Sequence, residues 1–229
     1  MLEKLLVWER DAFFMLNGSD STFLDHFMWL ISSKAVWIPL AVFILVVLFY
    51  KKNWKESLLI LLAIVLVITL CDQFASHLCK PLFTRFRPTH HPDFMDQVKV
   101  VFDYRGGKYG FISSHAANAF GFATFMTLLF RNKLFGCTVF VWAILNTYSR
   151  VYLGVHFITD IIPGAIAGLV FGASVYYLYS YLRPRLIPDA LAPASAIYPE
   201  SRKRLITYAV WATFLLIVIG NEFLVSCLR

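Results

Sequence analysis

Long apolar stretches separated by short polar segments dominate the sequence. Six of them contain no Asp, Glu, Lys or Arg, namely residues 35–50, 57–71, 110–130, 134–149, 161–182 and 205–221. Their lengths approach the ~17 to 25 residues that a membrane-spanning helix needs. The pattern predicts an all-α, polytopic membrane helix bundle of about six transmembrane helices.

The N-terminal residues follow a different pattern. Apolar and charged positions mix over residues 2–16 until Asn17-Gly18 ends the run, as is typical of an amphipathic helix in the membrane interface. A second apolar piece, residues 21–33, contains Asp25 and His26 and either lies in the interface or extends the first span. We therefore divide the chain into an interfacial segment (1–34), a membrane core (35–182), a cytoplasmic connection (183–204) and a last helix with the C-terminus (205–229).

Composition and charge support this interpretation. Hydrophobic residues make up 59% of the chain and charged residues 15%, and the mean hydropathy is +0.66. The net charge of +7 comes largely from short Lys and Arg groups that follow the first, third and fifth spans and precede the sixth. If the spans alternate, these groups share one side, which the positive-inside rule assigns to the cytoplasm. Because they are spread as topology signals, they argue against nucleic acid as a partner.

Three polar clusters lie together on the opposite, external side. The external segment, about residues 79–113, carries six Lys and Arg residues, and we interpret Lys80 and Arg87, beside a span end, as functional. Two further clusters flank spans on the same side. They are Ser113-Ser114-His115 before the third span and Ser149-Arg150, His156 and Asp160 before the fifth.

His156 and Asp160 are four residues apart where a helix should begin, so their side chains share one face. Asp160 can bind one ring nitrogen and leave the other free to attack phosphorus. A metal pair is the alternative, but two residues supply only two ligands, and no His-rich or Glu-rich set completes a site. The four cysteines also lack the paired spacing of a zinc site or a disulfide framework. We expect no metal and no cofactor.

Ser113 and Ser114 precede His115 where unpaired backbone N–H groups and the helix dipole favour an anion. A plain N-cap would by itself explain the serine pair. His115 favours a functional site, because an ionisable residue that opens an apolar span is costly unless it is paired or functional. With the cations of the other clusters as anion ligands, these groups suit phosphoryl transfer.

Two features inside the spans concern packing. Gly164, Gly168 and Gly172 form a doubled Gly-x-x-x-Gly that predicts close approach of a neighbouring helix. Near the outer end of the second span, a short polar run predicts a helix face turned toward the bundle; it contains Asp72, Gln73, Ser76 and His77.

The three clusters resemble the signature of the type 2 phosphatidic acid phosphatase superfamily over roughly residues 35–182. The matching pattern is Lys80-x6-Arg87-Pro88, Ser113-x-His115 and Ser149-Arg150-x5-His156-x3-Asp160. The resemblance implies that His156 forms a phosphohistidine, that Asp160 is its partner and that His115 protonates the leaving group. It implies phosphate binding by Lys80, Arg87, Ser113, the Ser114 backbone and Arg150. The chain departs from the usual Pro-Ser-Gly-His because Ser114 replaces the glycine, which narrows backbone access to the phosphate.

The resemblance further implies a metal-independent lipid phosphatase in the bacterial plasma membrane, with its site facing the periplasm or cell exterior. Undecaprenyl pyrophosphate is the first expected substrate, on small size and frequency within the family alone. Phosphatidylglycerophosphate, phosphatidic acid, the 1-phosphate of lipid A and a lipid phosphotransferase activity are alternatives. A transporter or channel should carry ionisable groups through the membrane depth, whereas these gather at one end. The expected partners are the substrate lipid and the bilayer, and the oligomeric state stays open.

Overall fold

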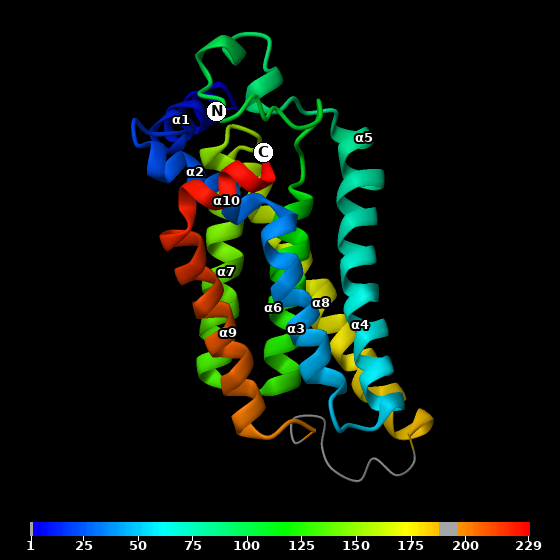
Figure 1. Ribbon diagram of the computed structural model, residues 1–229. Coiled ribbons are helices and arrows are strands. Elements are labelled where there is room, and N and C mark those ends of the chain that lie inside the picture. The colour runs from blue at the N-terminus through cyan, green and yellow to red at the C-terminus, as the bar shows by residue number, and fades with distance from the viewer. Residues whose placement is uncertain (1, 188–196) are drawn as a thin grey trace.

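The computed structural model describes residues 2–187 and 197–229 and consists of helices joined by short connections (Figure 1). Part of the predicted connection, residues 188–196, lies outside this described part. The α-helices are α1 (Leu2–Leu16), α2 (Thr22–Ser32), α3 (Lys34–Phe49), α4 (Trp54–Gln73), α5 (Lys80–Phe83), α6 (Ser114–Phe130), α7 (Lys133–Tyr152), α8 (Ile158–Leu186), α9 (Glu200–Ile219) and α10 (Asn221–Leu228). The described residues form no strand, so the predicted all-α class is confirmed.

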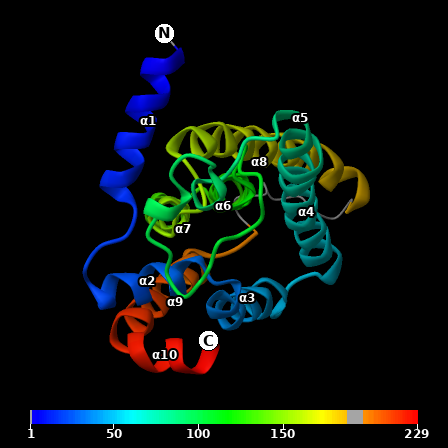
Figure 2. The same cartoon turned by 90° about the horizontal axis from the view of Figure 1, so that it is seen from above.

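The long helices run side by side, and α6 lies between α4, α7 and α8 (Figure 2). The segment between α5 and α6 gathers with α1, α2 and α10 at one end of the bundle (Figure 1). The four basic groups of the sequence lie at the opposite end, where α3 meets α4, α6 meets α7, α8 ends and α9 begins. The bundle therefore separates the predicted topology signals from the predicted site.

The number of membrane spans is smaller than expected. Three helices are long and apolar enough to cross a membrane, Trp54–Phe83, Lys133–Tyr152 and Ile158–Leu186. Two bent pairs, α2 with α3 and α9 with α10, raise the number to five if each pair forms one span. The remaining predicted span is α6, whose 17 residues make it shorter than these helices. The structure thus supports a membrane bundle with three to five candidate spans.

The second span is longer than the apolar run that predicted it. It continues as helix from Trp54 to Phe83, through a π-helical turn at Phe74–Cys79. Lys80 therefore lies on the last helical turns, and the external segment starts at Thr84 rather than at residue 79. A π-turn changes the hydrogen-bond register before Pro81, a residue that has no N–H to donate.

The N-terminal residues form two helices packed on the bundle. The predicted helix over residues 2–16 is confirmed as α1, and its Phe13 is fully buried with its ring 5.5 Å from that of Phe157. Its position in the membrane interface stays a prediction. The second apolar piece forms α2, which is bent by 50° from α3 at the break after Ser32.

The predicted glycine stripe determines how α8 meets α6. Gly164 faces the start of α6, where an added Cβ would lie 2.6 Å from the Ser113 carbonyl oxygen. Gly168 and Gly172 face backbone of α6 in the same way. Because no side chain separates the two helices, the first turn of α8 lies against the first turn of α6. The Ser113 N–H donates to the Asp160 carbonyl at 2.9 Å, which joins two of the three polar clusters.

Candidate active site

His156 and Asp160 meet at the start of α8, as their spacing predicted. The His156 Nδ1 lies 3.4 Å from Asp160 Oδ2, and the same oxygen accepts from the Phe157 N–H at 3.0 Å. Both side chains are buried. Nδ1 is thus engaged, and among residues 2–187 and 197–229 no hydrogen bond is made to the other ring nitrogen, Nε2. An imidazole held in this way presents Nε2 as a nucleophile.

Three cations from separate elements surround this imidazole. Burial, with the charges of Arg87, Arg150 and Lys80, lowers the pKa of His156 well below its usual 6.5. Burial and the nearby charge of Arg150 likewise lower the pKa of Arg87 to about 10. The structure brings these groups within electrostatic range of one another although they lie far apart in sequence. Such a concentration of positive charge favours a bound anion.

Neutral oxygens hold the two arginines in place. Arg87 Nε donates to the Tyr109 carbonyl at 3.0 Å, and Arg150 Nη2 donates to the Tyr104 hydroxyl at 2.7 Å. Arg150 Nη1 also donates to Ser32 Oγ. The Arg150 Nε is buried without a hydrogen-bond partner within the described part of the chain. No carboxylate there forms an ion pair with either arginine, so their charge remains available for a phosphate.

The second cluster lies at the beginning of α6. The Ser113 side chain accepts a hydrogen bond from the Ala116 N–H at 3.3 Å, so Ser113 is the N-cap of α6. An N-cap was the simpler of the two explanations that the sequence allowed for the serine pair. Within residues 2–187 and 197–229 the Ser113 hydroxyl donates no hydrogen bond, so its proton can bind a ligand. Ser114 Oγ lies 3.4 Å from Lys80 Nζ, which connects this cluster to the first. Next along the helix, His115 is half-buried and lines a cavity.

A loop backbone closes over these side chains. A Cβ at Gly110 would lie 3.0 Å from Asp160 Oδ2 and 3.5 Å from His156 Nδ1. At Gly106, where φ is +67°, a Cβ would lie 2.7 Å from Arg87 Nη1. The external segment approaches the site this closely because both positions lack a side chain.

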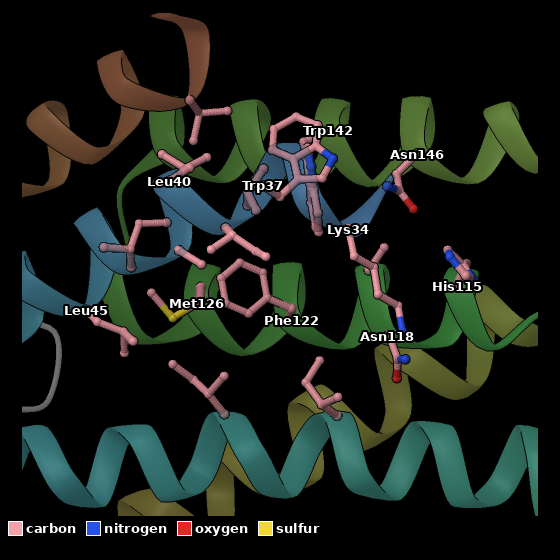
Figure 3. Close-up of a pocket in the computed structure, with 18 of the residues that line it drawn as sticks. Lys34, Trp37, Leu40, Leu45, His115, Asn118, Phe122, Met126, Trp142 and Asn146 are labelled. Carbon is pink, nitrogen blue, oxygen red and sulfur yellow. The ribbon is translucent and has the colours of Figure 1, made fainter. Parts of the chain in front are cut away.

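The cavity that starts at His115 extends between the helices (Figure 3). Its volume is about 490 Å³, and most of its lining comes from α3, α4, α6 and α7, with single residues from α2 and α9. Lys34 and Asn118 lie at the same end as His115, whereas Leu40, Phe122 and Met126 line the apolar remainder. A site of this kind can hold a phosphate at one end and hydrocarbon at the other.

Comparison with known families identifies the fold. The sequence profile of the PAP2 superfamily matches residues 58–184, which is more than half of the chain. The chain belongs to the PAP2 superfamily. The match lies inside the predicted membrane core except for its last two residues, 183 and 184. The protein is accordingly a metal-independent hydrolase of lipid phosphoesters, and the alternative of a transporter or channel is set aside.

Curated PAP2 relatives cover most of the chain. A lipid A 4'-phosphatase of Porphyromonas gingivalis is 48% identical over 91% of this chain and 89% of its own length. A lipid A 4'-phosphatase of Bacteroides thetaiotaomicron is 37% identical, with coverages of 84% and 86%. A putative undecaprenyl-diphosphatase, YbjG of Escherichia coli, is 29% identical, with coverages of 74% and 80%. The crystal structure of Aquifex aeolicus LpxE aligns with a TM-score of 0.49, 29% identity and coverages of 73% and 93%.

Residues outside the PAP2 signature also bind the Asp160 carboxylate or its immediate neighbours. Arg85 Nη1 donates to Asp160 Oδ1 at 2.7 Å and to Thr159 Oγ1 at 2.7 Å. Its Nη2 forms an ion pair with Glu9 of α1, whose carboxylate also accepts from the Thr159 hydroxyl. Arg85 is one of the six Lys and Arg residues of the external segment, but the sequence predicted a role in the site neither for it nor for Glu9.

Proposed function

We propose that this protein is a lipid A phosphatase that removes the 4'-phosphate. The support comes from two relatives of that name, 48% and 37% identical over most of the chain. The relative named for undecaprenyl diphosphate is 29% identical. The comparisons therefore favour lipid A, one of the alternative substrates expected from the sequence, over undecaprenyl pyrophosphate, the first expected substrate. They also favour removal of the 4'-phosphate of lipid A over removal of its 1-phosphate, which was the alternative expected from the sequence.

The geometric observation behind this proposal is that Ser114 and His115, which belong to the polar clusters, also line a largely apolar cavity. Arg87 and Arg150 are buried beside His156, and their charges bear on its imidazole. The cavity continues from His115 into the hydrophobic interior of the bundle. The phosphate of a lipid can then lie among the cations while its hydrocarbon stays in apolar surroundings.

We assign the reaction to two phosphoryl transfers. In the first, His156 Nε2 bonds to phosphorus as the bond from phosphorus to the sugar oxygen breaks, and His115 gives that oxygen its proton. In the second, water attacks the phosphohistidine, His115 takes the proton from the water, and inorganic phosphate leaves. Asp160 stabilises the charge on the His156 ring.

The remaining signature residues hold the phosphoryl group in this scheme. Lys80, Arg87 and Arg150 compensate the charge on the three phosphoryl oxygens. Ser113 donates its hydroxyl proton, and the N–H of Ser114 donates from the start of α6, where backbone donors are unpaired. Because Ser114 carries a side chain beside Lys80, a phosphate approaches this N–H through a narrower opening than glycine would leave.

We also propose that the site faces the periplasm, with the chain in the inner membrane. All four basic groups predicted to be cytoplasmic lie at the end of the bundle opposite His156. The positive-inside rule then places the site outside the cytoplasm. Labelling of single cysteines introduced at Lys55 and at Lys108 with an impermeant thiol reagent tests this orientation, after replacement of the native cysteines. The Lys108 position should react in intact spheroplasts, and the Lys55 position only after lysis.

The test of the function is phosphate release by the purified protein in detergent, with EDTA present. Lipid A carrying both phosphates should be converted to the 1-phosphate species, as judged by mass spectrometry, with a higher kcat/KM than undecaprenyl diphosphate or phosphatidic acid. His156→Ala and His115→Ala should each remove most of the activity. A higher kcat/KM for undecaprenyl diphosphate would reject the proposed substrate, and unchanged turnover by His156→Ala would reject the nucleophile.

A further inference from the structure

The polar end of the cavity includes residues that lie outside the PAP2 signature. Lys34 is the first residue of α3, and Asn118 lies on α6 one helical turn after Ser114. Both line the cavity together with His115, and Figure 3 shows the Lys34 side chain extending toward Asn118. Side chains from two different helices thus meet beside the catalytic end of the cavity.

These two side chains lack partners within the described part of the protein. Lys34 is an exposed residue, and its ammonium forms no hydrogen bond or ion pair there. The Asn118 Oδ1 is buried with no hydrogen-bond partner. Native structures pair almost all such buried atoms, and an amide that rotates by a half turn presents its NH2 group in place of its oxygen. A ligand that carries hydrogen-bonding oxygen atoms would satisfy both residues.

The position beside His115 indicates which part of the substrate reaches them. This step rests on the proposed function, in which His115 protonates the oxygen of the leaving lipid alcohol. The part of the substrate that extends from that oxygen into the cavity is therefore the lipid alcohol rather than the phosphoryl group. In an acylated lipid, the polar atoms close to the phosphate include the carbonyl and hydroxyl oxygens at the roots of its acyl chains.

A second anionic group is a poorer match for this place. Asp72 of α4 lines the same cavity, and its carboxylate accepts from Ser76 while Ser76 accepts from Lys80. A carboxylate across the cavity opposes a further phosphate, but it does not oppose neutral carbonyl oxygens. The apolar lining beyond Asn118, with Phe122 and Met126, suits the hydrocarbon that follows such carbonyls.

We propose that Lys34 and Asn118 form a subsite that binds the acyl-root oxygens of the leaving lipid alcohol. The subsite selects acylated lipid phosphates over those whose chains carry no oxygen, such as polyprenyl phosphates. The Lys34 ammonium donates to a carbonyl oxygen, and the Asn118 amide binds a neighbouring carbonyl or hydroxyl group.

The test compares two inhibitors that differ only in these oxygens. Diacyl phosphatidic acid and its dialkyl ether analogue of equal chain length are measured in mixed micelles as competitive inhibitors of p-nitrophenyl phosphate hydrolysis. Wild type should bind the diacyl lipid with a Ki about tenfold lower, since a hydrogen bond to a charged donor has roughly that effect. Lys34→Met and Asn118→Leu should bring the ratio of the two Ki values close to one, whereas Lys34→Arg should retain it. Lys55→Met, at the opposite end of the bundle, is the matched control and should also retain the wild-type ratio.

Because both Ki values of a ratio are measured on the same variant, a change in its overall activity or folded fraction affects both values equally and cancels in the ratio. A wild-type ratio near one, or a wild-type ratio retained in both Lys34→Met and Asn118→Leu, would overturn the subsite. Neither inhibitor is lipid A. A failure of lipid A as substrate therefore rejects the proposed function and leaves this comparison intact, while an unselective Ki rejects the subsite alone.

Discussion

Replacing Arg85 with methionine should destabilise the protein through two carboxylates at once. The Arg85 guanidinium lies between Asp160 of α8 and Glu9 of α1, with 2.7 Å from Nη1 to Asp160 Oδ1. The side chain of Asp160 is 0% exposed and that of Glu9 is 6% exposed. Methionine fills a similar volume but leaves both carboxylates without their cation.

The expected loss in the free energy of unfolding is about 3 kcal/mol. Removal of one partner from a buried ion pair costs about 3 to 5 kcal/mol. The lower value applies because the Arg85 side chain is 26% exposed and water reaches part of it. For a chain of this size, a loss of about 3 kcal/mol corresponds to a Tm lower by roughly 6 to 12 °C.

Thermal unfolding in detergent, followed by tryptophan fluorescence, measures this effect. Arg105→Met is the matched control, because Arg105 lies in the same external segment and its side chain forms no ion pair within the described residues, where it donates a hydrogen bond to the Thr89 carbonyl at 3.4 Å. Adding Glu9→Gln to Arg85→Met should restore part of the Tm, since one unpaired charge is then neutral. A Tm within 1 or 2 °C of wild type, or losses from the two substitutions that simply add, would refute the reasoning.

Three further outcomes follow from the site. Gly110→Ala should lower kcat more than tenfold with little change in Tm, because the added Cβ would lie 3.0 Å from Asp160 Oδ2. A variant with the kcat of wild type would contradict this. Burial and the charges of Arg87 and Arg150 lower the pKa of His156 well below 6.5, so ¹⁵N NMR of labelled histidine should find this ring neutral at pH 6 in the phosphate-free protein. As the pH falls below 6.5, the unfolded chain takes up a proton that the native ring does not, and the free energy of unfolding should decrease. Because the pKa of Arg87 is lowered to about 10, kcat/KM should fall as the pH rises through about 10, and a rate that is constant up to pH 11 would be inconsistent with Arg87 as a phosphate ligand.

Local patterns predicted the residues of this site because each cluster lies at the end of a helix. The spacing of His156 and Asp160 requires only the start of α8 to bring the two side chains together. The glycines of α8 then set its distance from α6, and the hydrogen bond from Ser113 N–H to the Asp160 carbonyl joins the two clusters. The fold class likewise follows from apolar run length.

Features that depend on tertiary contacts could not be predicted from the sequence. The second apolar run stops before Asp72, but the helix continues to Phe83. Its polar side chains bind one another rather than face lipid, since Ser76 donates to Asp72 and Lys80 contacts Ser76 and Ser114. The external segment determines where α6 begins, and hydropathy cannot locate that point. Glu9 and Arg85 are 76 positions apart, and the packing of α1 against Val98, Val151 and Phe157 brings them together.

The same distinction explains why a clear family signature left the substrate open. In the proposed mechanism the signature residues contact the phosphoryl group, and that group is the same in every lipid phosphate, so these residues carry no information about the lipid. In the same mechanism the leaving alcohol lies on the His115 side, where the cavity lining also includes Lys34 of α3 and Asn118 of α6, two residues outside the signature. If the proposed subsite is correct, the choice of lipid by this enzyme should depend on Lys34 and Asn118 rather than on the three clusters. Apolar substitutions at both positions should reduce the preference for lipid A over undecaprenyl diphosphate while His156 still forms the phosphoenzyme with either lipid.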